Sequence, residues 1–209
     1  MIAGPECGRS ELVRSYVAPT RREATTYIAC SPASQRLLCE VARDSEHPRP
    51  LLISGETGTG KTLLARTIHR SAARAYGEHR ATLHVVNCAA LHDALLDEAL
   101  APLAERTSEA ACETVLLDEV GELSPRGQAM LAERIEARLR LTPRAHFIAA
   151  SQRDLDAMTA AGKFHAGLFE TLGGARVFLA PLRKRRDEFI PLAMNFRRGA
   201  LATAQRDSV

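Results

Sequence analysis

The apolar residues of this chain fall into short continuous runs that alternate with longer stretches of helical spacing. A short apolar run bounded by turn residues is typical of a buried strand, and a three- or four-residue apolar period is typical of a helix packed on one side. Strands and helices in alternation predict an α/β domain with a parallel sheet covered by helices on both faces. The predicted strands are 51–53, 82–86, 114–117, 145–150 and 175–179, and the predicted helices are 35–42, one starting near residue 61, 92–105 and 125–139.

The helix at 125–139 shows the pattern most clearly. Leu131, Ile135 and Leu139 recur every four residues and predict its buried stripe. The remaining positions carry charge, and we expect them on a solvated or subunit-facing surface: Glu133, Arg134, Glu136 and Arg138.

Length and order of elements predict one domain preceded by an arm. At 209 residues the chain can bury a substantial core, and no internal repeat is evident. The prolines of "SEHPRP" separate the first helix from the first strand. We therefore expect residues 1–28 to form an N-terminal arm and residues 29–209 to form a nucleotide-binding α/β domain.

Composition narrows the class of protein. No apolar run approaches the roughly 18 residues that span a bilayer, and the N-terminus lacks a secretory core, so we expect a cytoplasmic protein with no membrane partner. A net charge of +3 is too small to indicate direct DNA binding, and the "RKRR" run at 183–186 is expected to be a solvated segment. Scattered cysteines without metal-ligand spacing indicate reduced packing residues: Cys7, Cys30, Cys39, Cys88 and Cys112.

A glycine-rich motif, "GETGTGKT", connects the first strand to the following helix. Gly55, Gly60, Lys61 and Thr62 match G-x-x-x-x-G-K-[ST], in which backbone amides cradle phosphates, the lysine reaches the β and γ oxygens and the hydroxyl binds Mg²⁺. The chain has few lysines, so one at this position is notable. The alternative is a glycine-rich turn with a solvated lysine. The residues expected to contact ATP here are Gly55, Glu56, Thr57, Gly58, Thr59, Gly60, Lys61, Thr62 and Leu63.

An acidic pair ends the third predicted strand in "TVLLDEVGEL". Asp118 is expected to hold Mg²⁺ through water, with Thr62 as the other metal ligand, and Glu119 is expected to orient the attacking water as general base. A polar strand end without catalytic meaning is the alternative. The phosphate-binding motif upstream favours the catalytic interpretation.

The chain resembles the AAA+ domains of bacterial enhancer-binding proteins, which activate sigma-54 RNA polymerase. The resemblance runs from about Cys30 to Leu201 and rests on six motifs in the family's order: "GETGTGKTLLARTIHRSAAR", "VVNCAAL", "VLLDEVGELSPRGQAMLAERIE", "FIAASQRDL", "GKF" and "LAPLRKRRDEF". It implies a three-layer αβα fold with a five-stranded parallel sheet, and ATP and Mg²⁺ as ligands. It also implies that Asn87 holds the catalytic glutamate and that Gln152 occupies the polar sensor position, where the family normally has asparagine. A strand-end cap is the alternative role for Asn87.

Three departures from the family pattern limit what the resemblance implies. The Gly-Ala-Phe-Thr-Gly-Ala loop that contacts sigma-54 is absent from "EALAPLAERTSEAACE". His165 and Thr171 stand where arginine fingers would be, so we expect weak hydrolysis. The given sequence ends with "NFRRGALATAQRDSV", so we expect the helical lid to be largely missing. Conversely, this chain has Thr62 where the family usually has glutamate. The threonine hydroxyl provides an ordinary Mg²⁺ ligand.

Three functions remain in competition. The first is an ATP-binding regulator of transcription that works with a related AAA+ activator or another regulatory protein, with self-association left open. The second is a non-catalytic adaptor or inhibitor that pairs with a full-length activator. The third, a small-molecule kinase, shares the phosphate-binding motif, but no acceptor-binding motif is evident.

Overall fold

The computed structural model describes residues 27–29, 34, 35, 37, 49–76, 81–105, 112–141 and 145–206. Nearly all of the predicted arm, and most of the predicted helix at 35–42, lie outside the described residues. Tyr27, which the prediction placed in the arm, is buried in the domain core.

A five-stranded parallel sheet forms the centre of the described structure. Its strands lie in the order β2-β3-β4-β1-β5, and each paired strand runs parallel to its neighbour. The strand predictions are therefore confirmed within a residue or two, at β1 (Leu51–Ser54), β2 (Ala81–Asn87), β3 (Cys112–Asp118), β4 (His146–Ser151) and β5 (Ala175–Phe178).

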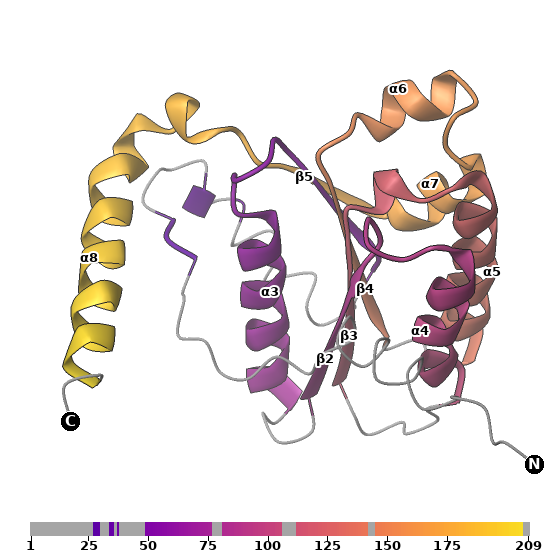
Figure 1. Cartoon of the computed structure of the whole chain (residues 1–209), viewed down its shortest axis with the longest axis horizontal. Helices are drawn as coiled ribbons and strands as arrows, with labels where there is room; N and C mark the ends of the chain where they lie inside the picture. The colour runs from indigo at the N-terminus through magenta and orange to yellow at the C-terminus, as the bar shows by residue number, and fades with distance from the viewer. Residues whose placement is uncertain are drawn as a thin grey trace, which may run out of the picture.

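Helices cover both faces of the sheet, which gives the predicted three-layer α/β architecture (Figure 1). Helix α3 (Lys61–Tyr76) covers one face, and α4 (Asp93–Glu105) and α5 (Pro125–Leu141) cover the other. The sequence pattern missed two short helices after β4, namely α6 (Leu155–Ala160) and α7 (Ala166–Leu172), because each is too short to establish a period. It also missed α8 (Phe189–Arg206).

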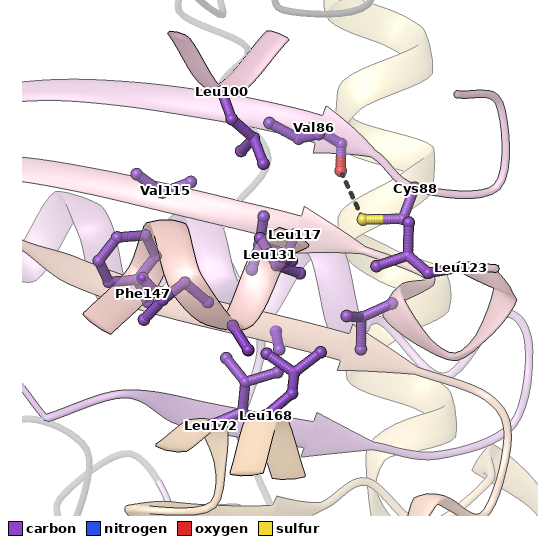
Figure 2. Packing of buried hydrophobic residues seen from close by; sticks show 14 of the residues in the cluster. Val86, Cys88, Leu100, Val115, Leu117, Leu123, Leu131, Phe147, Leu168 and Leu172 are labelled. Atoms are coloured by element: carbon purple, nitrogen blue, oxygen red, sulfur yellow. Dashed lines mark hydrogen bonds between the residues drawn. The ribbon is translucent and has the colours of Figure 1, made fainter. Parts of the chain in front are cut away.

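Strand alternation builds a separate apolar core on each face. Val115 and Leu117 of β3 point toward α4 and α5, where Phe147, Leu131 and Leu168 join them (Figure 2). Leu116, between them in sequence, packs in the other cluster, together with residues of α3. Helices cover both faces of the inner strands β1 and β4, which are buried along nearly their whole length and read as short apolar runs. The edge strands β2 and β5 are partly exposed.

The charged positions of α5 are only partly solvated. Leu131 and Ile135 are buried as predicted. Arg138 is buried as well, which corrects the prediction that it lies on a solvated surface: its Nη2 lies 2.5 Å from Glu113 Oε2 at the start of β3. A charge can be buried in this way because the carboxylate and the guanidinium neutralise each other.

The chain after β5 leaves the sheet and leads to α8 through two 3-10 turns, η3 (Leu182–Lys184) and η4 (Arg186–Glu188). Figure 1 shows α8 beyond α3, on the side away from α4 and α5. Helix α8 carries large apolar side chains that are exposed: Phe189, Ile190, Met194 and Phe196. Across the described ranges, no helix is both long and apolar enough to cross a bilayer.

Candidate nucleotide site

The predicted phosphate-binding residues form a loop at the carboxyl end of β1, which lies between β4 and β5 in the sheet. We call residues 55–60 the phosphate loop. Glycine is required at its start, since a Cβ on Gly55 would lie 2.6 Å from the carbonyl oxygen of Leu179. Gly58 and Gly60 have φ of 79° and 97°, a region that side chains rarely adopt. The loop therefore needs all three of its glycines for its shape.

Helix α3 begins directly after this loop, at Lys61. The partial positive charge of a helix N-terminus favours anions, and the backbone amides of the first turn have no partners within the helix. The loop is closed by bonds to Glu56 O from Thr59, whose amide lies at 3.3 Å and whose hydroxyl lies at 2.8 Å. These closing bonds join residues that are close in sequence, at the start of a helix whose first turn favours anions.

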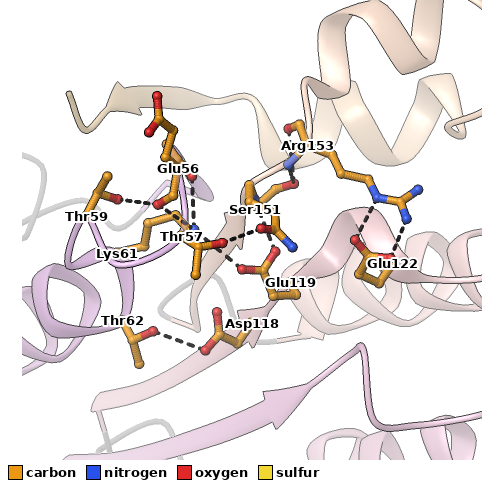
Figure 3. A network of polar contacts seen from close by, with 12 residues as sticks. Glu56, Thr57, Thr59, Lys61, Thr62, Asp118, Glu119, Glu122, Ser151 and Arg153 are labelled. Carbon is orange, nitrogen blue, oxygen red and sulfur yellow. Dashed lines mark hydrogen bonds and ion pairs between the residues drawn. The ribbon is translucent and has the colours of Figure 1, made fainter. Parts of the chain in front are cut away.

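Lys61 lies beneath the loop and is 6% exposed. Its Nζ donates to the carbonyl oxygens of Gly55 at 3.0 Å and Glu56 at 3.3 Å. It also forms an ion pair with Glu119 Oε1 at 3.4 Å. The ammonium is thus held between the phosphate loop and the acidic end of β3 (Figure 3).

Thr62 and Asp118 lie together at the base of this site. The Thr62 hydroxyl donates to Asp118 Oδ2 at 3.1 Å, joining the first turn of α3 to the end of β3. Both are oxygen ligands of the kind that Mg²⁺ prefers, and in such sites phosphate oxygens and water usually complete the coordination. The donor set therefore fits the metal that the sequence predicted there.

Glu119 follows β3 in a left-handed backbone conformation, with φ 54° and ψ 48°. That conformation costs a non-glycine residue about 1–3 kcal/mol and often marks a functional site. The carboxylate accepts a hydrogen bond from the backbone amide of Gln152 at 3.1 Å through Oε2, while Oε1 faces Lys61. The backbone thus directs Glu119 toward the phosphate loop.

Gln152 connects the end of β4 to the phosphate loop. Its Oε1 accepts a hydrogen bond from the Thr57 hydroxyl, so the side chain contacts the phosphate loop. Arg153, its neighbour, makes a two-bonded ion pair with Glu122, which fixes η2 (Val120–Glu122) behind Glu119. The glutamine side chain thus spans from the end of β4 to the loop, and a sensor role for it stays a prediction of the resemblance.

The sigma-54 interaction domain family matches this chain over residues 27–177. The chain belongs to that family. Among its curated relatives, it is 33% identical over 207 residues to the transcriptional regulatory protein ZraR of Klebsiella oxytoca, covering 90% of this chain and 46% of ZraR. It is 36% identical over 202 residues to the regulatory protein AtoC of Escherichia coli K12, covering 86% and 42%. The chain thus spans less than half the length of these relatives.

Solved structures agree with this sigma-54 interaction domain in fold. NtrX from Brucella abortus in complex with ATP has a TM-score of 0.63 at 22% identity, covering 84% of this chain and 43% of NtrX. The FIGL-1 AAA domain in complex with ADP has a TM-score of 0.57 at 13% identity, covering 86% and 63%. The fold of this domain is therefore that of AAA+ proteins.

Asn87 of this sigma-54 interaction domain lies beside the acidic pair, because β2 places it opposite Asp118 in the sheet register. Its Oδ1 accepts from the backbone amide of Ala89 at 3.1 Å and closes the turn after β2. That bond matches the strand-end cap that the sequence left as the alternative. Control of Glu119 by Asn87 stays a prediction of the resemblance.

The two finger positions have local structural roles in the domain. His165 is the N-cap of α7, where its Nδ1 accepts from the amide of Leu168 at 3.1 Å. Thr171 donates its hydroxyl to Gly167 O at 2.8 Å within the same helix. Neither residue can present a fixed guanidinium charge.

Two arginines of the "RKRR" run contact the site, which the sequence did not predict. Arg183, Lys184 and Arg186 are exposed, as expected of a solvated segment, but Arg183 and the half-buried Arg185 both contact the phosphate loop. The arginine run itself was the only signal. The side chain of Leu63 packs against the core cluster on the α3 side, and a nucleotide contact by this residue stays a prediction.

Proposed function

We propose that this chain is an ATP-binding AAA+ domain that acts in the regulation of transcription through a partner protein and hydrolyses ATP weakly. One observation carries the proposal: Lys61 and Thr62, at the start of α3, contact Glu119 and Asp118, at the end of β3. These four side chains have the chemistry to bind a triphosphate, its metal and an attacking water. The relatives ZraR and AtoC are regulatory proteins, and NtrX was solved with ATP.

Each residue has a separate task in this mechanism. Lys61 and the loop amides would bind the β- and γ-phosphate oxygens, and Thr62 and Asp118 would hold Mg²⁺, which would neutralise phosphate charge. Glu119 accepts a proton from water as the water oxygen attacks the γ-phosphorus and the bond to the β-phosphate oxygen breaks. Since Lys61 pairs with Glu119 in this structure, phosphate binding competes for the lysine and releases the carboxylate for this task.

Weak turnover follows from the residues at the finger positions. An arginine finger is worth on the order of 10³ to 10⁵ in rate, and His165 and Thr171 supply none. The proposed partner is a related AAA+ activator or another regulatory protein, and self-association of this chain is left open. Direct DNA contact is not part of the proposal.

A titration of the protein with a fluorescent ATP analogue in the presence of Mg²⁺ tests the proposal. We expect micromolar binding by the wild type and loss of binding in Lys61→Ala, because the ammonium offsets phosphate charge. Lys163→Ala is the matched control, since Lys163 is an exposed lysine after α6. Equal affinity of the wild type and Lys61→Ala for the ATP analogue would contradict the assignment of Lys61 as a phosphate-binding residue.

A second function, a non-catalytic adaptor, is favoured by the structural roles of His165 and Thr171. In that case nucleotide binding stabilises the fold without being turned over. Phosphate release by the purified protein separates the two functions. Release that depends on Glu119 supports the enzyme, and its complete absence in the presence of every tested partner supports the adaptor.

A further inference from the structure

The phosphate loop is held from outside by two arginines of one segment. Arg183, in η3, donates from Nη1 and Nη2 to the two carboxylate oxygens of Glu56, at 2.7 and 2.6 Å. Arg185, two residues later, donates from Nη2 to the carbonyl oxygen of Thr59 at 3.0 Å. Glu56 and Thr59 lie near the two ends of the loop, so the arginines contact it at both.

Arg185 is itself fixed by a buried polar cluster. Its Nη1 donates to Glu188 Oε2 at 2.9 Å and to the Tyr27 hydroxyl at 3.2 Å. Glu188 is 0% exposed and accepts a further hydrogen bond from the Ser34 hydroxyl. A buried carboxylate that is paired in this way fixes the guanidinium to one place, so Arg185 contacts the loop from a rigid base.

The bond to Thr59 bears directly on the anion site. The C=O and N–H of one planar trans peptide point in opposite directions, so holding the Thr59 carbonyl fixes the direction of the Gly60 amide. Gly60 has a positive φ of 97° and could otherwise change conformation at little cost. Arg185 therefore selects one orientation of an amide in the loop that would bind phosphate.

Glu56 places a negative charge in the same loop that would bind phosphate. Its carboxylate is half exposed and would repel a triphosphate if it were unshielded. The hydrogen bonds from Arg183 lower the pKa of Glu56 below its usual value, so the carboxylate is ionised at neutral pH. The charge of Arg183 then offsets that of Glu56 next to the site.

We propose that Arg183 and Arg185 are positioning residues of the phosphate loop, with Arg185 fixing the Thr59–Gly60 peptide and Arg183 neutralising Glu56. This inference rests on the proposed nucleotide site. It assigns to the "RKRR" segment a role in phosphate binding rather than in DNA contact. It also connects the loop to η4, the turn that leads into α8.

A double-mutant cycle tests the role of Arg183. With a fluorescent ATP analogue at low salt, we expect Arg183→Ala to weaken binding at least threefold, and less at high salt, because screening removes the repulsion by Glu56. Glu56→Gln should bind at least as tightly as the wild type, because it leaves the Arg183 charge unpaired next to the phosphates, and the double variant should match the wild type. Arg176→Ala, which breaks the exposed Arg176–Asp156 pair (2.9 Å), is the control and should leave affinity unchanged.

Direct contact of Arg183 with phosphate would give a different result. The double variant would then bind as weakly as Arg183→Ala, which would overturn the neutralising role. Unchanged affinity in Arg183→Ala would overturn it as well.

Hydrogen exchange without nucleotide tests the loop itself. Arg185→Lys keeps a positive charge next to Glu188 but loses the planar set of donors that reaches Tyr27, Glu188 and Thr59 together. We expect faster exchange of the amides of residues 57–61 in Arg185→Lys and Arg183→Ala, with exchange in α5 unchanged. Exchange at wild-type rates in both variants would overturn the proposal.

The two measurements also separate this inference from the proposed function. If the wild type binds no nucleotide but the variants show faster hydrogen exchange in the loop, the positioning role is supported and the proposed function is contradicted. A wild type that binds ATP, with variants unchanged in both affinity and exchange, would support the function and remove the positioning role.

Discussion

At the scale of single residues, the buried pair of Arg138 and Glu113 supports the amino-terminal end of the sheet, at the edge opposite the phosphate loop. Both side chains are buried, so neither charge can be solvated if its partner is removed. The energetic consequence differs from that of a surface pair. Helix α5 offers a direct comparison, because Arg134, one turn earlier, pairs with Asp97 at 2.6 Å where both side chains are exposed.

We therefore predict that Arg138→Ala lowers the free energy of unfolding by about 3 kcal/mol, since it leaves the Glu113 charge buried without its main partner. Arg134→Ala, the matched control, should cost less than about 1 kcal/mol because water screens the exposed pair. Urea denaturation followed by circular dichroism measures both. Equal losses in the two variants would contradict the prediction.

His69 gives the domain a pH dependence of its own. Burial lowers the pKa of His69 from 6.5 to about 4, with smaller contributions from the nearby charges of Arg70 and His84. Its Nδ1 lies 2.9 Å from the Thr114 hydroxyl. Because the folded state resists protonation, the unfolded chain binds more protons between pH 6.5 and 4, and stability falls as the pH falls through this window.

We predict that His69→Gln, which keeps a polar partner for Thr114, reduces the loss of stability between pH 6.5 and 4. Unfolding midpoints measured across this range test the slope. The exposed His92 provides the control substitution, His92→Gln. A slope in His69→Gln equal to that of the wild type would show that other groups cause the pH dependence.

At the scale of elements, α7 shows why the finger position is not simply a lost arginine. This seven-residue helix begins at an N-cap whose acceptor is the His165 ring, and the backbone amide of His165 in turn donates to Gln128 Oε1 at 2.8 Å. Short helices depend on such caps, since they have few internal bonds. A residue that caps α7 cannot at the same time extend a cation away from it.

We predict that His165→Arg lowers the free energy of unfolding by about 1 kcal/mol, because arginine has no acceptor for the Leu168 amide. His165→Asn should preserve stability, since asparagine is a good N-cap. Thermal and urea unfolding of the two variants provide the measurement. Greater stability in His165→Arg than in His165→Asn would contradict the capping role.

At the scale of the whole molecule, the site has acidic, hydroxyl and ammonium groups of its own but no arginine at the two finger positions. We predict that a related activator subunit with its own fingers raises ATP turnover at least tenfold, about 1.4 kcal/mol of barrier. The added subunit should carry an inactivated phosphate-binding lysine, so that released phosphate comes from this chain. The measurement is steady-state phosphate release.

Glu119→Gln is the control for that rescue, since it removes the base while keeping the shape of the side chain. The increase in ATP turnover caused by the added activator subunit should vanish in this variant. Rapid hydrolysis by the chain alone, unaffected by Glu119→Gln, would mean that the base is elsewhere.

The sequence by itself determined the sheet, its flanking helices and the phosphate loop. These features depend on residues that are close in the chain: apolar runs such as Leu51–Ser54, and a motif of eight contiguous residues whose glycines set the backbone. The acidic end of β3 was also predictable, because parallel strands bring their carboxyl ends to one edge of the sheet. Local periodicity and backbone sterics suffice for such features.

Only the tertiary structure decided which charges pair and what they hold. Arg183 meets Glu56 across 127 residues of sequence, and Arg138 turns from an apparent surface residue of α5 into the buried partner of Glu113. The same holds for the contact between Gln152 and Thr57, which are 95 residues apart. A charged side chain has no periodic signature that reveals its partner, because the strength of an ion pair depends on distance and burial, and the packing of distant segments sets both.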